Sequence, residues 1–413
     1  MQGGRDESWR GSRWLMRAVV LGGLAGVVGV AGWGFLHWGG RGGRGDDGRE
    51  PVGAGQAGLD GTDPAGRLRE ARRLLVGAIG GGTPVNWPGG EMLACLALLR
   101  SGSVEADLLG EIRQRLRARM RSDGALAGAD SRFSAYETAL GLLVVDALPA
   151  GDRSEALQAV RGAVLYLRRS VHGMDGAIGE EHAWYGGAHN GLLNGVLQRG
   201  SAEPDLHTTL HVALALSRVD PDLFASMRGA FGRFAQRCRV DPGGNDQRWS
   251  ALSPAGLRGL FVRSSSGPGR GGPGAGEAGG AARVAGVHSV AGSHLLVLCG
   301  LGGELRQGLD RLGWMGTARQ EPVFAGGGPG GVLERRSVYF HWQRAMLLDR
   351  LVREGWESEQ WLSRAGRLAA VLEVVGGADR AAGRDWGNVH EPGREGDSVT
   401  NAAMVLLVGL GEG

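Results

Sequence analysis

Apolar residues between positions 67 and 413 recur every three or four residues, and almost nowhere do they alternate strictly with polar residues. This spacing is typical of α-helices, in which one turn takes about 3.6 residues. Some of the segments are rich in arginine and carry a single apolar stripe, so they predict helices with one buried face. These amphipathic segments are 67–79, 104–121, 153–170, 222–238, 303–314 and 358–375.

A second kind of segment is apolar on nearly every side, and it alternates along the chain with the first kind. Helices of this composition are buried all round, so neighbouring pairs of helices have to stack to cover them. The sequence therefore predicts an all-α domain, an α/α toroid of about six hairpins with inner apolar and outer amphipathic helices. The apolar segments are 91–99, 135–148, 205–216, 289–301, 337–352 and 397–410.

One further apolar run, Ala18–Trp38, precedes these pairs and contains no Asp, Glu or Arg. As a helix it is about 31 Å long, which matches a bilayer core, so we expect a transmembrane anchor. Arginines before the run favour residues 1–17 in the cytoplasm and the main domain on the exported side, periplasmic or extracellular. A signal peptide cleaved after Ala31 is the alternative, and it exports the domain too.

The Gly-rich residues 39–66 then form a flexible linker, and residues 67–413 form the toroid domain. A second Gly-rich stretch, 264–286, predicts a disordered insertion inside that domain.

Composition removes several classes of function. All 46 basic residues are arginine, so no Schiff-base or P-loop lysine exists. The net charge of +3 comes from interspersed charges rather than a basic block, which argues against a nucleic-acid partner. Three well-separated cysteines, each within an apolar helical pattern, predict buried free thiols. They are Cys95, Cys238 and Cys299. We expect no cofactor.

Several stretches carry a family resemblance. MRSDGALAGADSRFSAYETALGLL (120–143) resembles a repeat in which glutamine and Asp-Gly-Gly-Trp precede an inner helix. AWYGGAHNG, EPDLHTTLHVALAL and the final GRDWGNVHEPGREGDSVTNAAMVLLVGL are similar to later repeats of the same kind. The chain thus resembles the prenyltransferase/squalene-oxidase repeat family, a divergent, bacterial, membrane-anchored member, whose relatives share the terpenoid cyclase α/α toroid. The family's Gln and Trp are replaced here, for example by Met120 and Leu126.

The resemblance places a catalytic motif on residues 205–209. In the cyclases an Asp-x-Asp-Asp-Thr element supplies the carboxylic acid that protonates an alkene. Asp205 and Thr209 match its ends, but His207 and Thr208 replace the two central carboxylates. Imidazolium, with a reference pKa of about 6.5, is a poor acid toward an alkene. Asp205 also suits a helix N-cap, so Asp205 and His207 remain weak catalytic candidates.

The loops that enter inner helices of a toroid converge at one end, so their aromatic and imidazole side chains are candidates for a cavity lining. Packing in the core is the alternative for each of them. The candidates are Trp184, Tyr185, His189, His211, His288, Tyr339, His341, Trp342 and Trp386. His207 and His211 are one turn apart and could share a metal, but without a further ligand in obvious spacing we expect no metal site. A zinc site of the protein prenyltransferase kind is also unsupported.

Sugar cleavage is the rival function for this fold. An enzyme of that kind would need paired carboxylates across the cavity. Loop candidates are Asp175, Glu180, Glu181, Asp246 and Asp385. The favoured hypothesis is a membrane-anchored, non-catalytic domain that binds an apolar or cell-envelope ligand or acts as a scaffold. The alternative is a divergent enzyme of the same fold that acts on an isoprenoid or a carbohydrate.

Overall fold

The computed structural model describes residues 63–411 except 82–84, 86–88, 103, 156, 191, 194–195, 198–202, 242, 252–257, 266–285, 306–337, 357–362 and 377–396. Contacts between residues divide the chain into Met1–Asp60 and Gly61–Gly413. All described residues belong to the second unit, and they are mostly helical, as the sequence predicts. The predicted anchor 18–38 and nearly all of the linker lie outside the described residues.

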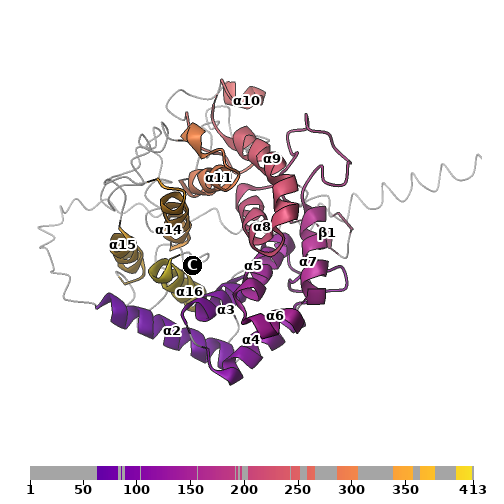
Figure 1. Ribbon diagram of the computed structural model, residues 1–413. Helices are drawn as coiled ribbons and strands as arrows, with labels where there is room; N and C mark the ends of the chain where they lie inside the picture. The colour runs from indigo at the N-terminus through magenta and orange to yellow at the C-terminus, as the bar shows by residue number, and fades with distance from the viewer. Residues whose placement is uncertain are drawn as a thin grey trace, which may run out of the picture. The chain divides into compact units, whose positions relative to one another are not determined.

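All six apolar segments of the sequence are helices. They are α3 (Gly90–Arg100), α5 (Ser134–Ala147), α8 (Leu206–Val219), α11 (Gly286–Leu298), α14 (Val338–Arg353) and α16 (Ser398–Leu410). Each contacts the next in this order, and α16 contacts α3, so their contacts form a closed cycle (Figure 1). We call these six the inner helices. Their apolar composition follows from this arrangement, since each has a neighbour on two sides.

Amphipathic helices lie outside the inner helices (Figure 1). They are α2 (Pro64–Gly80), α4 (Ala106–Ala118), α7 (Leu157–Ser170), α9 (Pro221–Cys238) and α15 (Arg364–Gly376). Helix α9 contacts α8 and α11, and α15 contacts α14 and α16. Helix α2 contacts α3 and α16, and α7 contacts α5 and α8, so these four outer helices each cover the seam between two inner ones, while α4 packs on α2.

Aspartates begin several of the helices. The side chain of Asp205 accepts a hydrogen bond from the backbone N–H of Thr208 at 2.9 Å. Asp397 does the same for Thr400 at the start of α16, at 2.8 Å. These are ordinary N-caps, which satisfy a donor that a helix end otherwise leaves without an acceptor. The shared Asp-x-x-Thr pattern thus has a structural role at two inner helices.

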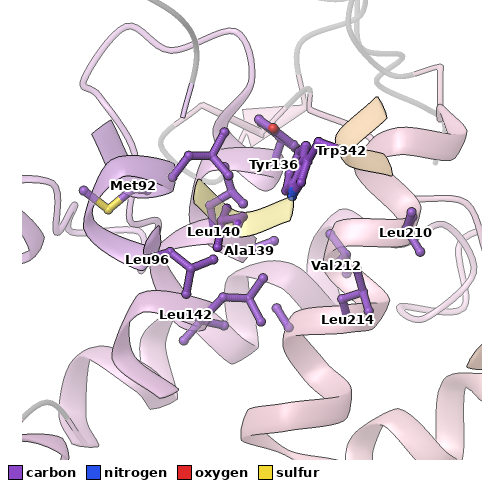
Figure 2. Close-up of a cluster of buried hydrophobic side chains, with 14 of the residues drawn as sticks. Met92, Leu96, Tyr136, Ala139, Leu140, Leu142, Leu210, Val212, Leu214 and Trp342 are labelled. Atoms are coloured by element: carbon purple, nitrogen blue, oxygen red, sulfur yellow. The ribbon is translucent and has the colours of Figure 1, made fainter. Parts of the chain in front are cut away.

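The core fills the space between the inner helices with aliphatic side chains. Leu96, Leu140 and Leu214 come from three successive inner helices and face one another in the close-up (Figure 2). The three cysteines are free and buried, as predicted. Burial raises the pKa of Cys95 and of Cys299 to about 12, so both remain thiols at neutral pH.

The structure differs from the sequence prediction in several short elements. Segment 153–170 is two helices, α6 (Ala150–Glu155) and α7, rather than one. A hairpin of two very short strands, β1 (Leu192–Leu193) and β2 (Val196–Leu197), and the one-turn helix α10 (Arg248–Ala251) were not predicted. Helix α2 begins at Pro64, so the predicted linker is too long by three residues at its end.

Two further predictions lie mostly outside the described residues. Of the amphipathic segment 303–314, only the 3-10 helix η4 (Gly302–Leu305) is described. Of the predicted insertion 264–286, Ser264 and Ser265 are ordered and buried, which corrects its first boundary, and Gly286 begins α11. Within the part of the chain that the structure describes, no helix has the length and apolar character needed to cross a membrane.

One glycine tests how closely the loops pack on the outer helices. Gly186 has a φ of 82°, and a Cβ at this position would overlap the carbonyl of Ala230 in α9. We expect Gly186→Ala to lower the free energy of unfolding by about 3 kcal/mol or more, measured by urea denaturation. Gly176 is the matched control, because its φ is 76° and its surroundings are open. Gly176→Ala should cost only about 1–2 kcal/mol, and equal losses in both variants would contradict the close contact.

Candidate functional site

The N-terminal ends of α8, α11 and α14 bring three predicted site residues together. The His207 Nε2 atom lies 2.8 Å from Nδ1 of His288. The Tyr339 hydroxyl lies 3.3 Å from the other ring nitrogen of His207. A hydrogen bond between two imidazoles needs one protonated and one bare nitrogen, so at least one of the rings is neutral. We call His207, His288 and Tyr339 the histidine cluster.

His211 forms a second layer, one turn further along α8. Its Nδ1 lies 2.8 Å from the carbonyl oxygen of His207 and must donate, since a carbonyl only accepts. Its Nε2 is then the acceptor for the side-chain amide of Gln343, at 3.4 Å. The His211 ring is 4.8 Å from the ring of Tyr136 and 5.7 Å from that of Trp342. We call these four residues the His211 layer, and they join α5, α8 and α14.

The two layers are continuous with each other. The ring of Tyr339 is 5.5 Å from His207 and 5.6 Å from Trp342. Figure 2 shows Trp342 beside Tyr136, at one end of the apolar cluster. Rings from α5, α8, α11 and α14 thus fill the space between the N-terminal parts of these inner helices.

Burial controls the charge of these imidazoles. It lowers the pKa of His207 and of His288, and the charges of neighbouring histidines and of Arg263 lower both further. Burial also lowers the pKa of His211, to about 4. All three rings are therefore neutral at pH near 7. A neutral imidazole can donate or accept a hydrogen bond, but it does not supply the strong acid that alkene protonation needs.

Asp205 is occupied by its role in capping α8. One carboxylate oxygen accepts the Thr208 N–H, and the other accepts the Thr208 hydroxyl at 2.7 Å. The same hydroxyl accepts a hydrogen bond from the side chain of Asn190 at 2.8 Å. A catalytic acid must present its own O–H to the substrate. In Asp205 both oxygens already act as acceptors, toward the residue that they cap.

Neutral imidazoles are also metal ligands, so the histidine cluster was a natural place for a metal. Within the described ranges, however, no group of three or more His, Cys, Asp or Glu side chains is placed to hold an ion. The pair considered from the sequence, His207 with His211, is engaged differently. The Nδ1 atom of His211 binds the backbone of His207, and His207 itself pairs with His288.

Three of the other cavity candidates lie together in a different place. His189 is 4.6 Å from the ring of His172, which is 5.3 Å from Trp184. Tyr185 lies beneath the guanidinium of Arg233, at 5.8 Å. These contacts pack the loop of residues 171–190 against α9, on the outer side of the inner helices. In these contacts Trp184, Tyr185 and His189 meet His172 and Arg233 rather than the histidine cluster.

The remaining two cavity candidates are His341 and Trp386. His341 is buried, and its Nδ1 lies 3.1 Å from the guanidinium of Arg344 on the same helix. It follows Phe340 and Tyr339 on α14, so its side chain leaves the helix in a different direction from that of Tyr339. Trp386 lies outside the described residues.

Two of the carboxylates that a glycosidase could use are bound to arginines. Asp246 is held by Arg237 through bonds of 2.7 and 3.0 Å, and Arg233 binds Glu180. The hydrogen bond from Arg237 is the main cause that lowers the pKa of Asp246, which makes it a poorer general acid. Together with Glu181 these groups line an open surface groove beside α9, while Asp175 caps a turn and Asp385 is outside the described residues.

A small, mostly enclosed cavity continues from the His211 layer toward the C-terminal ends of the inner helices. Its volume is about 40 Å³. Its apolar walls are Leu96, Leu140, Leu143, Leu214, Met346 and Leu407, and it reaches His211 and Trp342. Its polar rim consists of Arg100, Ser217, Arg218, Asp349 and Arg350. Small-molecule pockets commonly measure about 300–1,000 Å³, so this cavity as it stands cannot enclose a triterpene.

Sequence reasoning missed several of these residues. Tyr136 and Gln343 are polar side chains inside otherwise apolar inner helices, and that interruption is a signal that the sequence does contain. Arg100, Arg218 and Arg350 lie in the last turn of α3, α8 and α14. Basic residues are common at helix C-termini, so nothing in the sequence marked these three as neighbours.

Layers of side chains thus occupy the space between the inner helices, with imidazoles at the N-terminal ends of these helices and arginines at the C-terminal ends. Comparison with family models, curated proteins and solved structures gives no match for this chain. Its function therefore has to be argued from the site itself.

Proposed function

We propose that residues 67–413 form an α/α toroid of the prenyltransferase/squalene-oxidase repeat type that binds a ligand without chemical turnover. The closed cycle of contacts among the six inner helices supports the toroid. The covering of their seams by amphipathic helices is the second support. In this proposal residues 18–38 anchor the domain to a membrane and the domain lies on the exported side.

The observation that carries the non-catalytic part is the state of residues 205–208. Asp205 is buried and caps α8 through one carboxylate oxygen, as Asp397 caps α16, while its other oxygen accepts the Thr208 hydroxyl. His207 stands where the family's acid would be, and it is a neutral imidazole paired with His288. Neither group is a strong carboxylic acid directed at an open pocket, which alkene protonation requires.

The size of the cavity is a second, independent support. Water needs about 10–15 Å³ of such volume per molecule, so about 40 Å³ holds roughly three waters. A reaction that folds a thirty-carbon chain needs a preformed hollow of the chain's own shape. The aromatic side chains of the histidine cluster and the His211 layer occupy the space where such a hollow would lie.

A product assay tests the proposal. The purified full chain is incubated with squalene and with linear prenyl diphosphates, and the extracts are analysed by mass spectrometry. We expect no cyclised product from any of them.

The variants Asp205→Asn and Asp397→Asn are matched, because each replaces a capping aspartate by asparagine, which caps a helix about equally well. A cyclised product that disappears in Asp205→Asn but persists in Asp397→Asn would show that Asp205 is an acid catalyst. That result would overturn the non-catalytic assignment in favour of a divergent enzyme.

A further inference from the structure

The C-terminal ends of the inner helices bring arginines from three helices to one cavity. Arg100 is the last residue of α3, Arg218 lies in the last turn of α8, and Arg350 lies in the last turn of α14. All three line the cavity described above. The inner helices α3, α8 and α14 therefore run in the same direction, and we call this end of the cavity the arginine mouth.

The charges at the arginine mouth act on one another. Burial lowers the pKa of Arg100, and the charge of Arg218 lowers it further, while Asp146 opposes this effect. Partial desolvation also lowers the pKa of Arg353, an exposed neighbour of the mouth, with further lowering from Arg218 and Arg350 and an opposing effect of Asp349. Like charges thus lie close together at the mouth, where Arg100 and Arg350 are partly buried and Arg218 is exposed. An anion at this position would offset the repulsion between them.

The carboxylates near the mouth already have partners. Asp349 binds Arg367 of α15, and Glu354 binds Arg350 at 2.7 Å. In addition, the Nε atom of Arg350 is a buried donor that has no hydrogen-bond acceptor among the described residues. A buried donor without an acceptor costs free energy, so a site of this kind gains from any ligand that supplies an oxygen.

Partial negative charge on the helix C-termini offers another explanation for basic residues at this end. That interaction is weak and is screened within the last turn, and it accounts for single arginines rather than for their convergence. The helix-dipole interaction also does not explain the apolar walls of the cavity. An arginine that only interacts with a helix dipole needs no cavity lined by leucine and methionine side chains beside it.

We propose that the arginine mouth binds a short aliphatic anion, with its carboxylate or phosphate head among Arg100, Arg218 and Arg350 and its chain in the apolar cavity. The head takes charge-assisted hydrogen bonds from guanidinium groups, which suit planar or tetrahedral oxyanions. The chain contacts leucines and Met346 and ends against Trp342 and His211. This inference deepens the binding role proposed above and rests on it.

The ring layers decide the direction of entry. His211, Trp342 and Tyr136 close the cavity on the side of the N-terminal ends. A ligand therefore enters past the arginines, and its charged end stays at the mouth. The volume of about 40 Å³ takes only the end of such a chain, so the carbons next to the charged head remain between the arginines at the mouth.

Titration calorimetry on the full chain tests this site with hexanoate, hexyl phosphate, hexanol and inorganic phosphate. We expect both hexyl anions to bind, with hexanol and inorganic phosphate at least about tenfold weaker. If hexanol binds as tightly as the two aliphatic anions, the arginines contribute nothing and the site is only an apolar cavity. If inorganic phosphate binds as tightly, the apolar cavity contributes nothing and the site is only a charged rim. Either result, or no binding of the hexyl anions, overturns the proposal.

Variants locate the site. Arg350→Gln and Arg100→Gln should each weaken hexanoate binding about tenfold or more, because each removes a charged donor. Arg73→Gln is the matched control, since Arg73 is exposed on α2 and does not line the cavity. If Arg350→Gln fails to fold, Arg100→Gln and the hexanol comparison still decide. Failure here differs from failure of the proposed function, which a cyclised product would reveal while leaving anion binding intact.

Discussion

Lowering the pH from about 7.5 to about 5.0 should reduce the free energy of unfolding by about 6 kcal/mol. Three histidines carry this expectation: His189, His211 and His294 are only 3%, 1% and 0% exposed. Burial lowers the pKa of His189 and of His294 to about 3, and that of His211 to about 4. In the unfolded chain each would titrate near pKa 6.5, so each loses about 2 kcal/mol by pH about 5.0.

The sign follows from where the protons bind. A histidine with a lowered pKa in the folded state stays neutral there, while the unfolded chain takes up its proton. The contribution to stability is therefore complete above about pH 6.5 and is lost as the pH falls toward 4 or 3. Domains are typically stable by about 5–15 kcal/mol, so a loss of about 6 kcal/mol removes a large part of that stability. Urea denaturation at a series of pH values measures this directly.

A variant separates the titration from packing effects. His294→Gln changes the packing at every pH, but it should reduce the slope of unfolding free energy against pH by about 1.4 kcal/mol per unit between about pH 6 and 5. An unchanged slope in His294→Gln would show that this imidazole is not held neutral.

The inner helices could be predicted from the sequence because their pattern admits few alternatives. A segment such as 397–410 is apolar on all sides, so it must be buried all round, and α16 begins and ends within a residue of that range. The capping aspartates gave the starts of α8 and α16, since Asp-x-x-Thr satisfies the first backbone donors locally. Helices and their caps depend on nearby residues, which a sequence displays.

The site depended on contacts between distant residues, and these were only partly predictable. His207, His288 and Tyr339 meet because α8, α11 and α14 share one direction and neighbouring places, which no local pattern specifies. Trp184 and His189 were assigned to the same group, but they pack with His172 in the loop of residues 171–190, which lies against α9. The arginine mouth was missed for the same reason, since each arginine alone is an ordinary helix C-terminal residue.

A buried ion network that contains Glu137 connects α3, α4 and α5, and disrupting it is the second change with a large expected effect. Glu137 is 5% exposed and accepts hydrogen bonds from Arg119, from the backbone of Gly128 and from Ser131, at 2.8–3.0 Å. Arg119 also binds Glu91 of α3 at 2.6 Å, and Arg115 binds the same carboxylate. Two carboxylates and two guanidinium groups therefore satisfy one another where the helices meet.

Glu137→Ala should lower the free energy of unfolding by about 3–5 kcal/mol, measured by urea denaturation at neutral pH. The loss is large because the variant removes one partner of a buried pair, leaving Arg119 less compensated and the Gly128 N–H without its acceptor. Glu70→Ala is the matched control, since Glu70 pairs with Arg67 near the surface of α2 with its side chain 38% exposed. That pair should contribute less than about 1 kcal/mol.

Glu137→Gln distinguishes charge from hydrogen bonding within the same network. Glutamine keeps an oxygen that can accept from Gly128 or Ser131, but it cannot neutralise Arg119. We expect the free energy of unfolding of Glu137→Gln to lie between those of the wild type and Glu137→Ala, because only the ionic part of the interaction is removed. A loss in Glu137→Ala no larger than in Glu70→Ala would mean that solvent reaches Arg119, and that the three helices are held by their apolar contacts alone.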